Sequence, residues 1–187
     1  MYYFTCMIIF VTNQQLKELE EAHMLRGELT ATQQLTLISS YDDLSQALEG
    51  AFFVQECVFE QLEIKQSVFQ EVEQIVGKDV ILSSSTSCLV PSSVFSTVQN
   101  KSRCLVSHPV NPPYYVKLVE LVPHPQTTAT IMDTTHALMT KVNTPHSIHQ
   151  ISVDLIVIVK IPPVKFFGPL MHLTQHSHPA GDYVFME

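Results

Sequence analysis

The chain has little positive charge and no long apolar run, and each shortage excludes a class of protein. It carries 10 Lys and Arg against 18 Asp and Glu among 187 residues, a net charge of -8. Such a charge repels a phosphate backbone, so we expect no nucleic-acid partner. The apolar residues 1–11 are fewer than the roughly 20 that a membrane-spanning helix needs, and they have no basic leader. We therefore expect a cytoplasmic protein that binds no membrane.

Glycine and cysteine are also scarce and scattered. The five glycines never approach the G-x-G-x-x-G spacing of a phosphate-binding turn. The cysteines show no C-x-x-C spacing, which argues against a zinc site or a redox pair and favours small buried apolar groups. They are Cys6, Cys57, Cys88 and Cys104. Three tail histidines at H-x-x-x-H-x-H spacing lack a completing carboxylate or Cys, so we expect no metal. They are His172, His176 and His178.

The apolar pattern alternates between helical and strand-like periods over most of the chain. Helices are predicted at 13–25, 31–38, 42–48, 60–76, just after Pro91, and 128–142, and strands at 51–54, 80–82, 103–106 and 117–122. This alternation predicts an α/β protein with a doubly wound, mostly parallel sheet, whose ligands bind at the carboxyl ends of the strands. The pattern breaks down beyond 143, where we expect a poorly ordered C-terminal tail.

One segment, residues 107–120, joins a histidine at a strand end to a later carboxylate. His108 precedes the turn-forming pair Pro112 and Pro113, and Glu120 follows His108 by twelve residues. A sharp turn would bring Glu120 beside the imidazole, where a carboxylate fixes the tautomer of a proton-transferring histidine. On the residues alone, a loop histidine held by prolines is the commoner case, because histidines at strand ends are frequent.

Several stretches of the chain resemble the 3-hydroxyacyl-CoA dehydrogenase superfamily. They are residues 54–58 (VQECV) with Glu60 and Lys65, 82–89 (LSSSTSCL), 108–125 (HPVNPPYYVKLVELVPHP) and 135–139 (THALM). The resemblance covers roughly residues 14–142. It implies a Rossmann-type domain at 1–142, with 143–187 as a divergent remnant of the family's helical C-terminal domain.

The resemblance also implies NAD as cofactor, a small hydroxy acid as substrate and a set of site residues. In the family's pattern His108 takes the hydroxyl proton, Glu120 holds the imidazole, and Ser87 and Asn111 complete the site. Glu60, Lys65 and Ser87 fall at cofactor-contacting positions. On the residues alone, Ser87 equally suits a helix cap and Asn111 an ordinary turn. For Glu60 and Lys65, two solvated surface charges are the commoner case.

The chain also departs from the family's pattern. The glycine-rich first turn and most of the helical domain are missing, as in a truncated variant with an incomplete Rossmann sheet, and we expect residues 1–11 to replace part of the missing central strand. Two functions follow. One is an NAD-dependent oxidoreductase, impaired by the missing turn, and the other is a non-catalytic, crystallin-like or subunit-associating fragment that forms a homo-oligomer.

Overall fold

The computed structural model describes residues 2–25, 27–111, 116, 118–143, 155–160 and 182–186. The helices are α1 (Tyr2–Glu21), α2 (Ala31–Leu35), α3 (Leu44–Leu48), α4 (Leu62–Ile75), α5 (Pro91–Val94), the 3-10 helix η1 (Lys101–Arg103) and α6 (Ala129–Asn143). The strands are β1 (Ile38–Tyr41), β2 (Phe53–Cys57), β3 (Ile81–Ser84), β4 (Cys104–Pro109), β5 (Val119–Pro123), β6 (Leu155–Lys160) and β7 (Asp182–Met186). This succession confirms the predicted α/β class.

The strands form one sheet in the order β1-β7-β6-β2-β3-β4-β5. Strands β2, β3 and β4 are parallel neighbours, and β5 closes that side antiparallel to β4. The crossover from β2 through α4 to β3 is the predicted βαβ unit. Because parallel strands end on the same side, the loops after β2, β3 and β4 meet along one carboxyl edge of the sheet.

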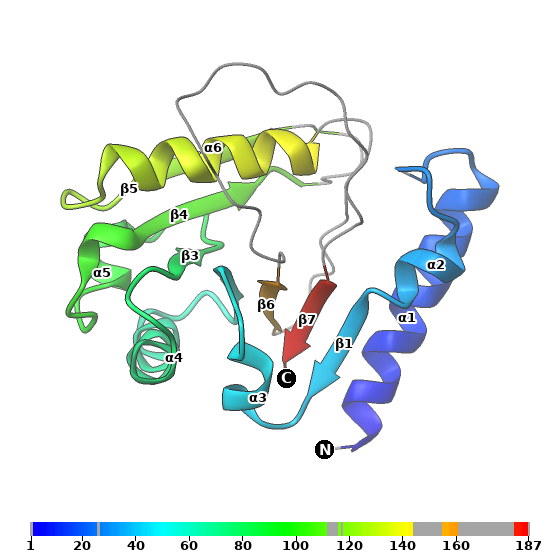
Figure 1. Ribbon diagram of the computed structural model, residues 1–187, viewed down its shortest axis with the longest axis horizontal. Coiled ribbons are helices and arrows are strands. Elements are labelled where there is room, and N and C mark those ends of the chain that lie inside the picture. The colour runs from blue at the N-terminus through cyan, green and yellow to red at the C-terminus, as the bar shows by residue number, and fades with distance from the viewer. Residues whose placement is uncertain are drawn as a thin grey trace.

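Helices cover both faces of the parallel strands, with α6 on one face and α4 on the other (Figure 1). Successive strand residues point to opposite faces: Val54 packs with the residues of α4, and Phe53 packs toward α6. Phe69 of α4 and Phe95 are fully buried, with ring centroids 4.6 Å apart. Burying each such ring contributes roughly 1.5–3 kcal/mol. Among the described residues, the cluster on the α4 face holds ten buried residues and that on the α6 face four, so the α4 face is the larger source of stability.

Strand β1 was not predicted, and the helix expected over 31–38 is wrong in its second half. Thr30 caps α2 through a reciprocal pair of hydrogen bonds with Gln33, but the helix ends at Leu35. The next residues form β1, which pairs in parallel with β7. A four-residue strand with two serines has a weak local pattern, and its partner lies more than a hundred residues away in the chain, so periodicity could not reveal it.

The expectation that residues 1–11 form a strand is also wrong. They belong to α1, which is continuous from Tyr2 to Glu21. The place between β1 and β2 is filled instead by β6 and β7, which come from the predicted tail. Strand β6 runs antiparallel to β2. The other tail residues, including His172, His176 and His178, lie outside the described residues.

The cysteines are not uniformly buried as expected. Cys104 is buried and Cys57 is partly buried, whereas Cys88 is exposed. Burial raises the pKa of both the Cys57 and the Cys104 thiol to about 12, so these two are unreactive at neutral pH. The side chain of Cys6 lies outside the described residues.

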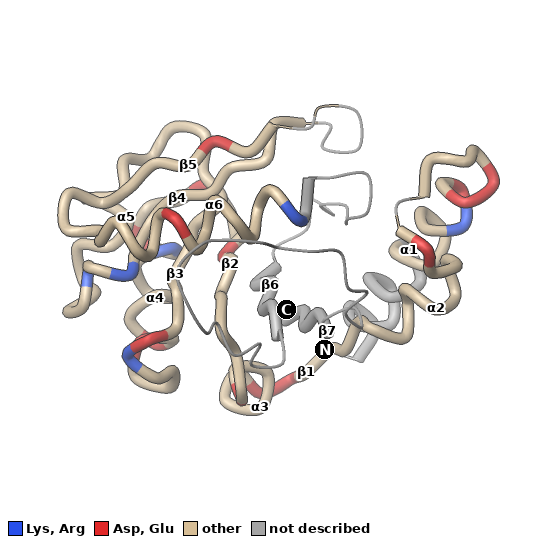
Figure 2. Tube along the Cα trace, turned by 45° about the horizontal axis from the view of Figure 1, so that its top comes forward, with Lys and Arg blue, Asp and Glu red and all other residues tan. Residues whose placement is uncertain are grey.

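Three further findings concern only the described residues. None of their helices is long and apolar enough to cross a membrane. In the same part of the chain, no group of three or more His, Cys, Asp and Glu side chains is arranged to hold a metal ion. Lys and Arg are scattered among the acids rather than gathered on one face (Figure 2).

His124 gives the fold a testable pH dependence. It is 7% exposed, and its Nδ1 accepts a hydrogen bond from the Gln126 N–H at 3.0 Å. Burial, with a smaller effect of the Lys101 charge, lowers the pKa of His124 below its ordinary value. The unfolded chain therefore binds this proton more readily, so the associated stability is present above about pH 6.5 and is lost as pH falls toward the folded pKa.

We expect the free energy of unfolding to fall as pH decreases from about 7.5 to about 5.5, by at most about 1.4 kcal/mol per pH unit for this one proton. In His124→Gln the slope should be smaller, because glutamine can still accept the hydrogen bond but does not titrate. Urea unfolding of both proteins across this range measures the difference. Parallel slopes would show that other groups cause the dependence.

Candidate active site

Four of the predicted site residues lie at the carboxyl edge of the sheet. Glu60 is in the loop after β2, and Ser87 is in the loop after β3. His108 is the last residue but one of β4, and Asn111 follows that strand. Ser87 and Asn111 are exposed there. The edge thus presents hydroxyl, amide, carboxylate and imidazole groups from three successive strand ends.

The structure places Glu120 beside His108. The two residues face each other in the antiparallel pairing of β4 and β5. The His108 Nδ1 lies 2.9 Å from the Glu120 Oε2, and the side chains are 19% and 56% exposed. A carboxylate accepts only, so Nδ1 carries the proton in this contact and Nε2 keeps its lone pair. The arrangement leaves one imidazole nitrogen able to accept a proton.

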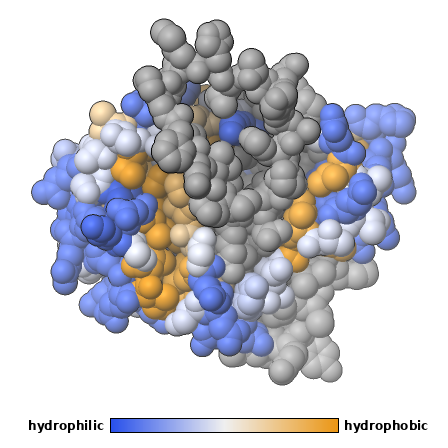
Figure 3. Space-filling model, in the orientation of Figure 1, coloured by the Kyte–Doolittle hydropathy of each residue, from blue (hydrophilic) through white to orange (hydrophobic). Residues whose placement is uncertain are grey.

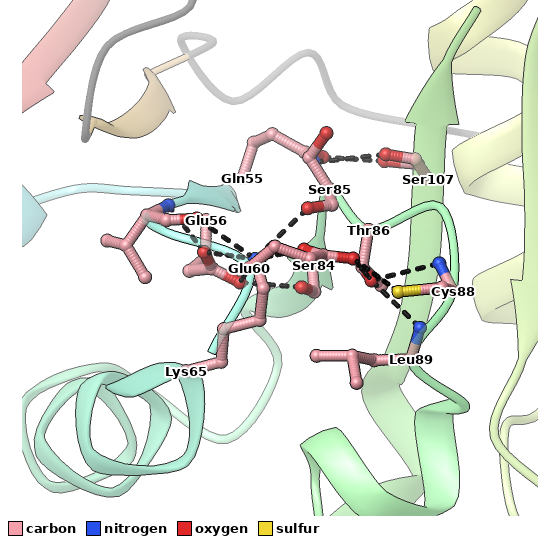
Figure 4. Close-up of polar contacts among 11 residues, drawn as sticks. Gln55, Glu56, Glu60, Lys65, Ser84, Ser85, Thr86, Cys88, Leu89 and Ser107 are labelled. Atoms are coloured by element: carbon pink, nitrogen blue, oxygen red, sulfur yellow. Dashed lines mark hydrogen bonds and ion pairs between the residues drawn. The ribbon is translucent and has the colours of Figure 1, made fainter. Parts of the chain in front are cut away.

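A polar network joins Ser107, the residue before His108, to the neighbouring strands (Figure 4). The Ser107 hydroxyl donates to the Gln55 Oε1 at 2.5 Å, and the Gln55 Nε2 donates to the Ser107 carbonyl at 3.0 Å. The Ser83 hydroxyl lies 2.6 Å from that of Ser107. These bonds join the middles of β2, β3 and β4, so they fix the backbone that carries His108.

The Lys65 side chain extends from α4 into a buried polar cluster beneath the same edge of the sheet (Figure 4). Its Nζ lies 2.9 and 3.2 Å from the two carboxylate oxygens of Glu56, and both side chains are 0% exposed. Burial raises the pKa of Glu56, and the Lys65 charge offsets part of that effect. The alternative that Lys65 is a solvated surface charge is therefore wrong.

Glu60 links this cluster to the loop after β3. Its carboxylate lies 3.4 Å from the Lys65 Nζ and accepts hydrogen bonds from the Thr86 hydroxyl and the Cys88 thiol. Partial burial acts to raise the pKa of Glu60, but the Thr86 and Cys88 bonds and the Lys65 charge together outweigh it and lower the pKa. Glu60 is therefore a carboxylate at neutral pH, partly exposed at the edge.

Sequence reasoning assigned no role to Glu56 or Thr86, which organise this edge. A carboxylate two residues after the apolar run 51–54 was the available signal, since a charge that the strand buries needs a partner. The partner, Lys65, stands nine residues later on a helix. No pattern in the sequence shows which side of that helix faces the sheet edge at this point.

A family model described as 3-hydroxyacyl-CoA dehydrogenase, NAD binding domain, matches residues 10–149. The chain belongs to this family. It is 53% identical over 129 residues to the lambda-crystallin homolog of Rattus norvegicus and 49% identical over 129 residues to the lambda-crystallin of Oryctolagus cuniculus. These matches cover 69% of the chain and 40% of each relative. The chain thus spans well under half the length of these curated relatives.

Solved structures of the same fold include two bacterial dehydrogenases. The 3-hydroxybutyryl-CoA dehydrogenase of Escherichia coli gives a TM-score of 0.65 at 23% identity, over 71% of this chain and 28% of that one. The (S)-3-hydroxybutyryl-CoA dehydrogenase of Ralstonia eutropha gives 0.62 at 23% identity, over 72% of this chain and 46% of that one. At this identity the likeness establishes the dehydrogenase-like fold and nothing finer.

The family implies NAD, and the described residues fit one half of that cofactor. The hydroxyl of Ser87 and the carboxylate of Glu60 stand at the edge where the nicotinamide ribose of a Rossmann-type domain binds. None of the described glycines lies where a turn could bind the pyrophosphate half of NAD. Gly50 and Gly77 precede β2 and β3 and so lie at the opposite edge, and Gly27 lies between α1 and α2. Ser87 and Glu60 would therefore hold the nicotinamide half, and the described residues include no glycine turn for the phosphates.

Proposed function

We propose that this chain provides the proton-transfer half of an NAD-dependent oxidoreductase that acts on the CH–OH group of a small hydroxy acid. The resemblance to lambda-crystallin, also called L-gulonate 3-dehydrogenase, supports L-gulonate as the substrate and 3-dehydro-L-gulonate as the product. The observation that carries the proposal is the contact of His108 with Glu120 at the carboxyl edge of the sheet. A small acid with one reacting hydroxyl suits a single base of this kind.

In this proposal His108 acts as the general base. With the Nδ1 proton directed at Glu120, the Nε2 lone pair accepts the proton of the substrate hydroxyl. The resulting imidazolium is stabilised by the Glu120 carboxylate 2.9 Å away. NAD, when bound, accepts the hydride from the substrate carbon that carries this hydroxyl. Ser87 and Asn111 orient the substrate oxygen by hydrogen bonds, and Glu60 accepts a hydrogen bond from a ribose hydroxyl.

The missing glycine turn lowers the expected affinity for NAD, since hydride transfer needs a positioned cofactor. Calorimetric titration of the purified chain with NAD is the first test, followed by an assay for NADH production from L-gulonate. Measurable binding with L-gulonate-dependent NADH production supports the proposal. Absence of binding would mean that the His108 and Glu120 pair is retained without oxidoreductase activity in this chain.

A second candidate function is non-catalytic association, either with a second copy as a crystallin-like homo-oligomer or with a full-length subunit. Exposed apolar side chains favour it. Phe59 is 61% exposed and Val90 is 57% exposed, on the loops after β2 and β3. Hydrophobic residues also gather in two patches on the described surface, one on the left and one on the right of Figure 3. Such surface promotes association. Sedimentation analysis that finds only monomer at all concentrations would exclude self-association.

A further inference from the structure

We propose that Lys65 is a positioning residue of the edge: it holds the loops after β2 and β3 in place from beneath and does not contact the cofactor itself. This inference rests on the proposed function for its consequence in ligand binding. It differs from the direct contact that the resemblance implies. Three observations carry it. The Lys65 side chain is buried, its N–H groups are all hydrogen-bonded, and further hydrogen bonds join Glu56 and Glu60 to the loops after β2 and β3.

The ammonium group of Lys65 has no donor left for a ligand. It has three N–H groups. They are directed at the Glu56 carboxylate, at the Val58 carbonyl 3.2 Å away and at the Ser85 carbonyl 3.1 Å away, with the Glu60 carboxylate at 3.4 Å. The side chain is 0% exposed. A bound cofactor could reach this nitrogen only if part of the cluster opened.

Glu56 extends the same cluster into both loops. Its Oε1 accepts from the Val58 N–H at 2.6 Å, and its Oε2 accepts from the Ser84 hydroxyl at 2.5 Å. Its carbonyl accepts from the Ser85 N–H at 2.7 Å. Lys65 and Glu56 together therefore join the ends of β2 and β3 through buried, charge-assisted bonds, which are stronger than neutral ones.

The outer bonds of the cluster shape the segment that carries Ser87. Glu60, held by Lys65, accepts from the Thr86 hydroxyl. The Thr86 Oγ1 in turn accepts from the Leu89 N–H at 3.0 Å and the Cys88 N–H at 3.4 Å. Ser87 stands between these anchored residues, so the direction of its exposed hydroxyl depends on the cluster. Loss of Lys65 should release Glu60 and this segment together.

Hydrogen exchange of the ligand-free chain tests the positioning directly. In Lys65→Met, the amides of Val58, Cys88 and Leu89 should exchange about tenfold faster or more, because the charge-assisted bonds beneath them are gone. Lys65→Arg should restore part of the protection. Arg103→Met is the matched control, because Arg103 is also buried and bonded to carbonyls and to Glu73, but at the opposite edge. It should leave those three amides unchanged.

Titration with NADH separates positioning from direct contact. If the wild-type chain binds NADH, Lys65→Met should weaken binding. Glu56→Gln, at a buried residue of the same cluster, should weaken it by a similar factor, and the double variant should weaken it little further. The inference would be overturned if Lys65→Met weakened NADH binding and Glu56→Gln did not. It would also be overturned if the amides of Cys88 and Leu89 exchanged at the wild-type rate in Lys65→Met. A wild-type chain that binds no NADH counts against the proposed function, and the exchange result then decides on the positioning role. Thr86→Val, which removes the buried hydroxyl that donates to Glu60 without leaving an unpaired charge, tests the same loop if Lys65→Met does not fold.

Discussion

Replacing His108 by Gln is expected to lower the rate of L-gulonate oxidation by about 10²–10⁴-fold, the usual contribution of a positioned general base. Glutamine keeps a hydrogen-bonding side chain opposite Glu120 but has no lone pair basic enough to take the hydroxyl proton. The side chain is 19% exposed and glutamine can still bond Glu120, so the free energy of unfolding should change by less than about 1 kcal/mol. Steady-state NADH production and urea unfolding of the same samples measure the two quantities.

Glu120→Gln should lower the rate less than His108→Gln does. Its carboxylate orients and stabilises the imidazole and takes no proton from the substrate, and it is 56% exposed, so water can replace part of its effect. His136→Gln is the matched control, because His136 is an exposed histidine on α6, outside strands β4 and β5. It should keep the wild-type rate. If the His108 and His136 variants turn over equally fast, His108 is not the base.

The parallel part of the fold was predictable because its signals are local. Strands β2 and β3 are short apolar runs separated by one amphipathic helix, and that order specifies a βαβ unit. The pairing of His108 with Glu120 was predictable for a similar reason: the two residues are close in sequence and a turn-rich segment separates them. Strands β1, β6 and β7 depend on partners distant in the chain. Their positions in the sheet follow from long-range pairing, which no periodicity records.

The candidate site was predictable only where exposed residues carry it. Ser87, His108 and Asn111 follow predicted strands, so their place at the carboxyl edge followed from topology. The buried cluster beneath them did not. Lys65 occupies the first turns of an amphipathic helix, where a lysine usually lies in solvent, and only the packing of α4 against the ends of β2 and β3 turns it inward. A charged residue in a buried strand, as at Glu56, is the signal to follow in such cases.

The second large effect is expected for Lys65→Met, which should lower the free energy of unfolding by about 3–5 kcal/mol. The substitution leaves the Glu56 carboxylate fully buried without its cation, and desolvation of an unpaired charge is costly. Methionine has nearly the shape of lysine, so little of the loss would arise from packing. Urea unfolding monitored by circular dichroism measures it. A loss below about 1 kcal/mol would mean that water reaches Glu56 and that the pair is not a buried one.

Adding Glu56→Leu to Lys65→Met should recover most of that stability, because replacing both members of a buried ion pair with apolar side chains is often neutral or stabilising. The loop after β3 should not regain its order, since Glu60, Val58 and Ser85 have still lost their bonds to Lys65. A double variant that is stable, yet exchanges rapidly at Cys88 and Leu89, would separate the two roles of the cluster. Its charges would then serve the arrangement of the edge, because apolar residues could supply the stability without them.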